Sequence, residues 1–216
     1  MFNKRNFSRV LVLLFFLFMS CKAPPPSVIK NSLDTGNLHF EKGHYDKAIT
    51  SYSMVTTTLG NSTDPNLATA YYNRGLAYFM KHDYNKAIED FSLVIAINPR
   101  DDRAYRNRGN ARVREKHHDE AIEDFNMAIK INPLDLNSHY SLGMIYFRKQ
   151  QCGKTVEILS RAIALNPNFA KAYNGRGQAY MRSGNMENAI SDFQKACKMG
   201  ENCGCIMLEL ISKKEE

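Results

Sequence analysis

From residue 68 to residue 203, small, apolar and polar residues recur with a period of 34. Each period has a glycine, a small residue (threonine in one period) twelve positions later and a large apolar residue sixteen positions later. The glycines are Gly75, Gly109, Gly143 and Gly177, the large apolar residues are Phe91, Phe125, Leu159 and Phe193, and three periods close with Asn-Pro at Asn98, Asn132 and Asn166. Proline lacks an amide proton and disfavours the α conformation in the residue before it, so each Asn-Pro is expected to end a helix. Glycine inside a helix costs about 1 kcal/mol relative to alanine, so its recurrence indicates close contact with a second helix.

A fixed period of this length with these residues is typical of an array of helix–turn–helix repeats. The residues resemble the tetratricopeptide repeat (TPR) family, in which each repeat is a pair of antiparallel helices, A and B. The resemblance implies an all-α, right-handed α-solenoid, and the apolar run at 205–211 after Gly204 predicts a short capping helix. The expected units are a degenerate first repeat at 29–67, repeats at 68–101, 102–135, 136–169 and 170–203, and a capping helix with its tail at 204–216.

The first repeat departs from the pattern of the others. Gly36, Ala48 and Tyr52 hold its signature positions, but Ser32 and His39 replace the aromatic residues that later repeats place on helix A. Five extra residues precede the small residue of the next repeat, so a longer helix B or a longer loop is predicted. Terminal repeats are often atypical because one of their faces meets solvent.

An arginine just before the glycine and an aspartate just before the large apolar residue occur together or not at all. The repeat at 136–169 has neither and carries Leu142 and Ile158 instead. This covariation predicts ion pairs within a repeat, linking helix A to helix B, and assigns these charges to the fold rather than to a ligand. The predicted pairs are Arg74 with Asp90, Arg108 with Asp124, and Arg176 with Asp192.

A second face of each helix A, about 130° from the glycine face on a helical wheel, holds aromatic, amide and basic residues. In the resembled family this face lines a concave groove that binds peptides, which implies a peptide-binding site here. The residues assigned to it are Tyr72, Asn73, Leu76, Phe79, Arg103, Arg106, Asn107, Asn110, Arg114, Tyr140, Met144, Phe147, Lys171, Asn174 and Gln178. A basic centre with aromatic flanks favours a partner segment that carries an acid between hydrophobic anchors.

Part of this set resembles the clamp by which some family members hold a C-terminal carboxylate. Arg106, Asn110 and Lys171 match that clamp, whereas Ser141 and Gly175 replace its other two residues. The resemblance therefore implies an incomplete clamp.

The N-terminus reads as an export signal. Three basic residues precede an apolar run at 10–19, which is too short to span a bilayer core of about 30 Å. The residues at 17–21, Leu-Phe-Met-Ser-Cys, resemble the lipobox of bacterial lipoproteins, so a signal peptide at 1–20 and lipidation of Cys21 are expected. An ordinary secretory signal is the alternative.

The lipoprotein resemblance implies a chain anchored by lipid in the bacterial cell envelope, facing the periplasm or the cell surface. It favours the outer over the inner membrane, because Lys22 is not the aspartate that favours inner-membrane retention. The prolines at 24–26 predict an extended linker over 21–28. Loss of residues 1–20 would lower the formal charge from +7 to +4, so no nucleic-acid partner is expected.

The cysteines and histidines offer little further chemistry. In an oxidising compartment Cys197 could bridge to Cys203 or to Cys205. The candidate metal ligands are His44, His82, His117, His118 and Cys152. They are expected near the turns between helices A and B. Successive hairpins lie too far apart for such residues to bind one metal ion together. No metal site, cofactor or catalytic arrangement is predicted.

The sequence therefore favours a non-enzymatic, membrane-anchored scaffold that binds a partner protein segment, in envelope assembly or secretion. One alternative is a structural module that pairs through a terminal repeat into an oligomer without a peptide ligand. The other is a metal-binding protein or an enzyme that uses the histidines and Cys152.

Overall fold

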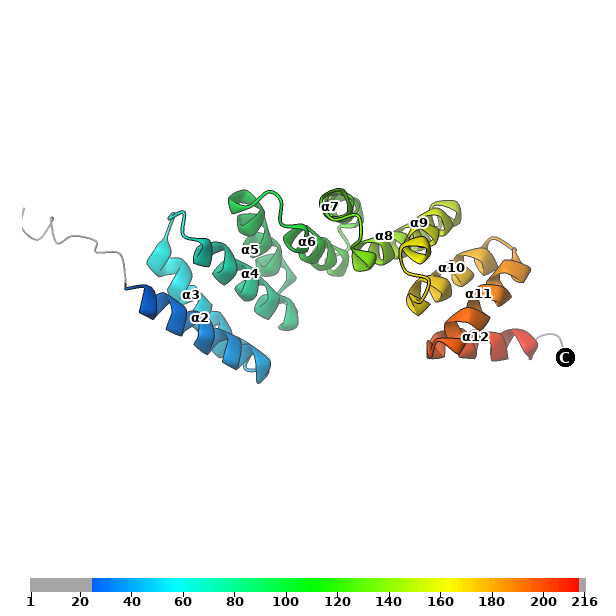
Figure 1. Ribbon diagram of the computed structural model, residues 1–216, viewed down its shortest axis with the longest axis horizontal. Helices are drawn as coiled ribbons and strands as arrows, with labels where there is room; N and C mark the ends of the chain where they lie inside the picture. Colours follow the sequence, from blue (N-terminus) through cyan, green and yellow to red (C-terminus); the bar gives the residue numbers. More distant parts are fainter. Residues whose placement is uncertain (1–24, 214–216) are drawn as a thin grey trace, which may run out of the picture.

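The computed structural model describes residues 25–213, and every regular element in this range is an α-helix. Within residues 25–213, eleven helices follow one another (Figure 1). They are α2 (Pro26–Glu41), α3 (Tyr45–Leu59), α4 (Pro65–Met80), α5 (Tyr84–Ile97), α6 (Asp102–Arg114), α7 (His118–Ile131), α8 (Leu136–Arg148), α9 (Cys152–Leu165), α10 (Ala170–Arg182), α11 (Met186–Lys198) and α12 (Asn202–Ser212). The prediction of an all-α repeat array is confirmed.

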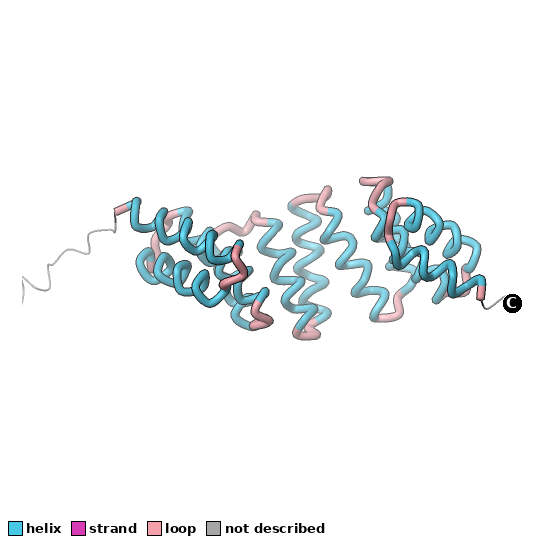
Figure 2. Tube along the Cα trace, turned by 90° about the horizontal axis from the view of Figure 1, so that it is seen from below, coloured by secondary structure: helices cyan, strands magenta, loops and turns pink. Residues whose placement is uncertain are grey.

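The helices pack pairwise as antiparallel hairpins, from α2 with α3 to α10 with α11, and α12 packs on α11. Figure 1 shows the hairpins side by side in a curved array, with α2 and α12 at its two ends, and Figure 2 shows the short loops that join them. The even-numbered A helices α4, α6 and α8 contact one another in sequence, so they form a continuous face.

The local sequence explains where the helices begin and end. Side chains of aspartate or asparagine accept a hydrogen bond from the first turn of α4, α5, α6, α8 and α11, which satisfies amide protons that have no partner within the helix. The helices α5, α7 and α9 end just before Asn98, Asn132 and Asn166, as the Asn-Pro pairs predict.

Each hairpin is closed by the glycine and the large apolar residue of its repeat. A Cβ atom on Gly75 would lie 2.9 Å from a ring carbon of Phe91, and the other repeats show the same contact. The phenylalanines at this position and Leu159 are fully buried. The recurrent glycine is therefore required because the side chain of helix B occupies the place of its Cβ.

The extra residues after the first repeat are shared among several elements. Helix α3 has 15 residues where α5 has 14, and α4 has 16 where α6 has 13. The earlier start of α4 at Pro65 is favoured because proline suits the first turn of a helix. Part of the expected longer segment is thus an N-terminal extension of the next helix A.

The expected extended linker at 21–28 is shorter than predicted. Helix α2 begins at Pro26, and Pro25 stays extended with a ψ of 137°. Proline at the first helical position is preorganised for the helix, whereas the residue before it is held out of the α region. The helix therefore begins inside the range predicted to be a linker, of which residues 21–24 lie outside the described residues.

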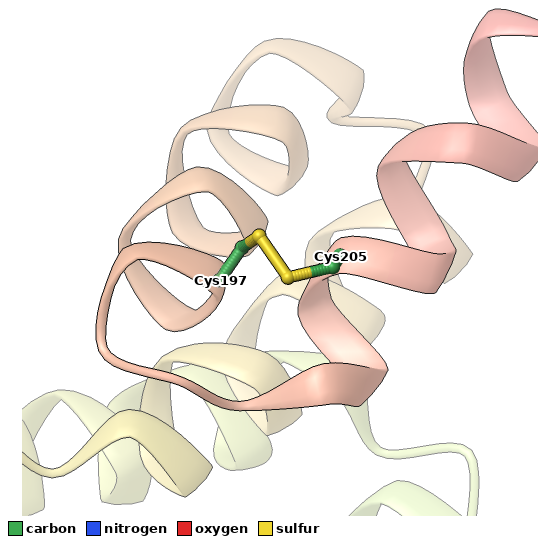
Figure 3. Close-up of a disulfide and its surroundings, with 2 residues drawn as sticks. All are labelled: Cys197 and Cys205. Carbon is green, nitrogen blue, oxygen red and sulfur yellow. A yellow bond between two sulfur atoms is a disulfide. The ribbon is translucent and has the colours of Figure 1, made fainter.

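The capping helix begins earlier than residue 204, at Asn202. A Cβ on Gly204 would lie 2.9 Å from the Phe193 carbonyl oxygen, so this glycine lets α12 lie directly on α11. A disulfide between Cys197 and Cys205 joins the two helices (Figure 3), while Cys203 is exposed. Residues two apart on a helix point in nearly opposite directions, so only one of the two candidate cysteines faces α11.

Candidate functional site

The three predicted ion pairs form between helices A and B of their repeats. Nitrogen–oxygen distances are 2.7 Å in each pair, and the aspartates are almost fully buried. Each arginine also donates a hydrogen bond to a serine on the preceding helix B, which the sequence analysis missed. We call each trio an arginine staple, and the staples are Ser53–Arg74–Asp90, Ser92–Arg108–Asp124 and Ser160–Arg176–Asp192.

The serines have a signal in the sequence, since they share one position of the repeat. Before Leu142 that position holds Asn126. Asp124 also accepts a hydrogen bond of 2.7 Å from Arg112, a second partner that the other two staples lack. These arginines are held by the fold, so they supply no free charge to a ligand.

The A-helix face contains a hollow of about 400 Å³ between α4, α6 and α8, which we call the groove pocket. Five of the predicted groove residues line it: Phe79, Asn110, Arg114, Tyr140 and Met144. Ser141 also lines it, together with Val113, Ile145 and Arg148, which the sequence analysis did not assign. Arg148 could have been found because it stands 34 positions after Arg114.

Two cations, Arg114 and Arg148, line the groove pocket together with its apolar residues. Among residues 25–213, neither Arg114 nor Arg148 has a carboxylate within the 4.0 Å of an ion pair. Tyr140 also lines the pocket, and burial above all, and then Glu201 and Cys203, raise the pKa of its phenol. The pocket can therefore offer a hydrogen-bond donor and two guanidinium groups to an anion, beside apolar side chains.

The two arginines expected at the groove centre have partners within the fold. Arg106 forms an ion pair of 2.9 Å with Asp135, which also accepts a hydrogen bond of 2.6 Å from Ser138. Burial alone would raise the pKa of Asp135, but its bonds to Ser138 and Arg106 hold it below the usual value. Arg103 bonds Asp101 at 3.2 Å. The free positive charge of this face thus lies at the C-terminal ends of α6 and α8 rather than at Arg103 and Arg106.

The N-terminal members of the predicted set connect successive A helices. Asn107 donates to the Tyr72 hydroxyl at 2.8 Å, and Asn73 donates to Asn37 at 3.1 Å. Tyr72, Asn73 and Arg103 line a second hollow of about 510 Å³ at the start of α4 and α6. Leu76 lies in a smaller one of about 160 Å³ beside α2.

The C-terminal members do not line the groove pocket. Arg182 stacks on Phe147 with 4.3 Å between guanidinium carbon and ring centroid. Asn174 is buried, whereas Lys171 is exposed and Gln178 is half-buried. A Cβ on Gly175 would lie 3.1 Å from the sulfur of Met144, so α10 packs closely on α8 here. The structure thus separates the predicted groove into a central pocket and outlying residues.

The remaining predictions concern metals and membranes. In the part of the chain that the structure describes, no three His, Cys, Asp or Glu side chains are grouped to hold a metal ion. No helix between residues 25 and 213 is long and apolar enough to cross a bilayer. Cys21 and the signal at 1–20 lie outside the described residues.

Comparisons with known proteins agree with this architecture. The sequence model of the tetratricopeptide repeat matches residues 68–101, 102–134 and 170–203. The crystal structure of MamA is similar, with a TM-score of 0.72 and 26% identity, over 82% of this chain and 94% of MamA. The structure of YrrB, described as a TPR protein with an unusual peptide-binding site, has a TM-score of 0.67 and 21% identity, over 85% of this chain and 90% of YrrB.

A curated relative covers much less. Protein unc-45 homolog B of Danio rerio is 31% identical over 68 residues, which are 32% of this chain. The chain spans 7% of that protein's length.

Proposed function

We propose that this chain, whose helices pack as a tetratricopeptide-like solenoid, a scaffold fold that is typically non-enzymatic, binds an acidic segment of a partner protein in its A-helix groove. The observation that carries the proposal is the groove pocket, where Arg114 and Arg148 lie beside apolar side chains and have no ion-pair partner among residues 25–213. An unpaired guanidinium pair favours a carboxylate, and the apolar floor favours a hydrophobic residue beside it.

The chemistry of the pocket defines the segment. Phe79 and Met144 offer apolar contact, while Asn110 and Ser141 provide polar groups. A pocket of about 400 Å³ lies within the range of typical ligand sites. An aspartate or glutamate next to an aromatic or aliphatic residue satisfies both features.

A selection from a phage-displayed library of random peptides tests this function. We expect enriched peptides to carry an acid beside a hydrophobic residue, and to lose at least tenfold in affinity for the Arg114→Glu/Arg148→Glu variant. The matched control is Arg100→Glu/Lys198→Glu, which makes the same charge change at exposed sites outside the pocket. Helical content and melting temperature check that both variants fold.

Two results would count against the groove. One is an absence of enriched peptides. The other is equal binding by wild type, the pocket variant and the control, which would assign the interaction to another surface.

The cellular setting is a separate part of the proposal. We infer from the sequence at 17–21 that Cys21 carries a lipid and holds the scaffold on a membrane of the bacterial envelope, the outer membrane being favoured by Lys22. Such a protein would localise its partner for envelope assembly or secretion. Labelling with a radioactive fatty acid should mark the wild type and not Cys21→Ser, which should also leave the membrane fraction; an unlabelled wild type would refute the anchor.

A further inference from the structure

The outer face of the array, formed by the B helices, is sealed by arginine staples at three of its junctions. The arginine reaches a serine on one B helix and an aspartate on the next, with nitrogen–oxygen distances between 2.7 and 3.1 Å in the staple centred on Arg74. The staples join α3 to α5, α5 to α7 and α9 to α11. Each staple fills the furrow between two B helices with a hydrogen-bonded side chain.

The junction between α7 and α9 has no staple. Asn126, Leu142 and Ile158 stand where the other repeats have serine, arginine and aspartate. A hollow of about 210 Å³ opens here, and we call it the B-helix cleft. Leu142 and Ile158 form its floor together with Tyr146 and Ile129.

The size and lining of the B-helix cleft suit one apolar group. An engineered apolar cavity of about 150 Å³ in another protein is large enough to bind benzene. A cleft of about 210 Å³ with an aliphatic floor can therefore accept a phenyl ring or a branched aliphatic side chain.

The rim adds one free positive charge. Arg161 is paired with Glu157 at 2.7 Å, so these two charges offset each other. The Lys154 ammonium lies 5.0 Å from the Tyr146 ring centroid, and no described carboxylate lies within ion-pair distance of it. The His139 ring is held at 3.0 Å from the Pro133 carbonyl oxygen. A carboxylate beside the inserted group would thus complement the ammonium.

We propose that the B-helix cleft is a second binding site, which takes one aromatic or aliphatic side chain of a partner protein together with a neighbouring carboxylate. The site lies on the opposite face of α8 from the groove pocket, because the two hollows use different α8 residues. It is independent of the groove, so a scaffold of this kind engages two segments at once.

Phenylacetate, which joins a phenyl ring to a carboxylate, serves as the probe. Titration of the isotope-labelled full chain should shift amide signals in α7, α8 and α9. Phenylacetamide, its neutral analogue, should bind several-fold more weakly to the wild type, and the difference should vanish in Lys154→Gln. Phenylacetate can also enter the groove pocket, so the cleft is read from the signals of α7 and α9, which line the cleft and not the groove pocket. These shifts should be unchanged in the groove variant Arg114→Glu/Arg148→Glu, which separates this site from the proposed function.

The decisive variant rebuilds the missing staple. Asn126→Ser/Leu142→Arg/Ile158→Asp copies the neighbouring repeats and should lower phenylacetate affinity at least tenfold while helical content is kept. If this variant does not fold, Ile158→Phe fills the cleft with apolar volume and should have the same effect. The proposal is overturned if the wild type shows no shifts at millimolar probe, if the shifts occur at the groove pocket and not in α7 and α9, or if the filled variants show the same α7 and α9 shifts as the wild type.

Discussion

Replacing Arg176 with leucine should destabilise the array strongly, because it leaves a buried carboxylate without its partner. The guanidinium holds Asp192 by two hydrogen bonds, of 2.7 and 2.9 Å, and the aspartate side chain is 4% exposed. Removing one member of a buried ion pair costs about 3–5 kcal/mol. For a chain of this length that corresponds to a fall of about 6–20 °C in melting temperature.

The chain itself supplies the matched control. Repeat 136–169 has Leu142 and Ile158 at the two positions, so Arg176→Leu/Asp192→Ile copies an arrangement that this fold already uses. Exchanging a buried ion pair for apolar residues of similar volume is often neutral or stabilising. We therefore expect the double variant to unfold close to the wild type.

The free energy of unfolding of both variants is measured by urea and thermal unfolding followed by circular dichroism. The single variant Asp192→Ile is included to complete a double-mutant cycle. Hydrogen exchange locates the loss, since repeats in an array can unfold in part. We expect each member of the pair to be needed because it neutralises the buried charge of the other. This would be refuted if Arg176→Leu lowered the free energy of unfolding by less than about 1 kcal/mol, or if the double variant were as unstable as Arg176→Leu alone.

Three further outcomes follow from the packing. Gly143→Ala would place a methyl group 2.8 Å from a side-chain carbon of the facing helix and should cost about 1–3 kcal/mol, whereas Gly153→Ala meets open space and should not lower the urea midpoint. Reducing the disulfide, or Cys205→Ser without reductant, should speed amide exchange in α12 at least tenfold and leave α8 unchanged, because only one residue of α12 is buried. The pKa of Asp135 is held below its usual value, so its stabilisation is complete above the unfolded pKa near 3.9 and is lost as the pH falls through the lower folded value. Asp135→Asn should therefore lower stability at pH 7 and flatten the acid limb of an unfolding titration.

The sequence was sufficient for the features that recur with the repeat. The glycines, the Asn-Pro pairs and the apolar residues determine helix count and pairing because each makes the same local contact in every period. The ion pairs could also be predicted, since Leu142 and Ile158 replace both partners together. Periodicity thus identifies contacts within a hairpin.

Contacts between side chains of different repeats could not be predicted from the sequence. Asp135 lies 29 residues after Arg106 and comes from the turn before α8, so no repeat position marks the two as partners. The groove pocket forms where α4, α6 and α8 meet, so it includes Arg148, whereas Lys171 and Gln178 on α10 lie outside it. A helical wheel gives the direction of a side chain from its own helix and not the distance to the next.

The staple and its apolar replacement are close in stability but leave different surfaces. A buried ion pair and a well-packed apolar pair contribute similar net stability, so repeat 136–169 can lack the staple without weakening the array. An arginine spans two B helices, whereas Leu142 and Ile158 end short of Asn126 on α7 and leave the B-helix cleft open. The two arrangements therefore differ in the surface that the B helices present, rather than in net stability. Rebuilding the staple should close the B-helix cleft in an array that still folds.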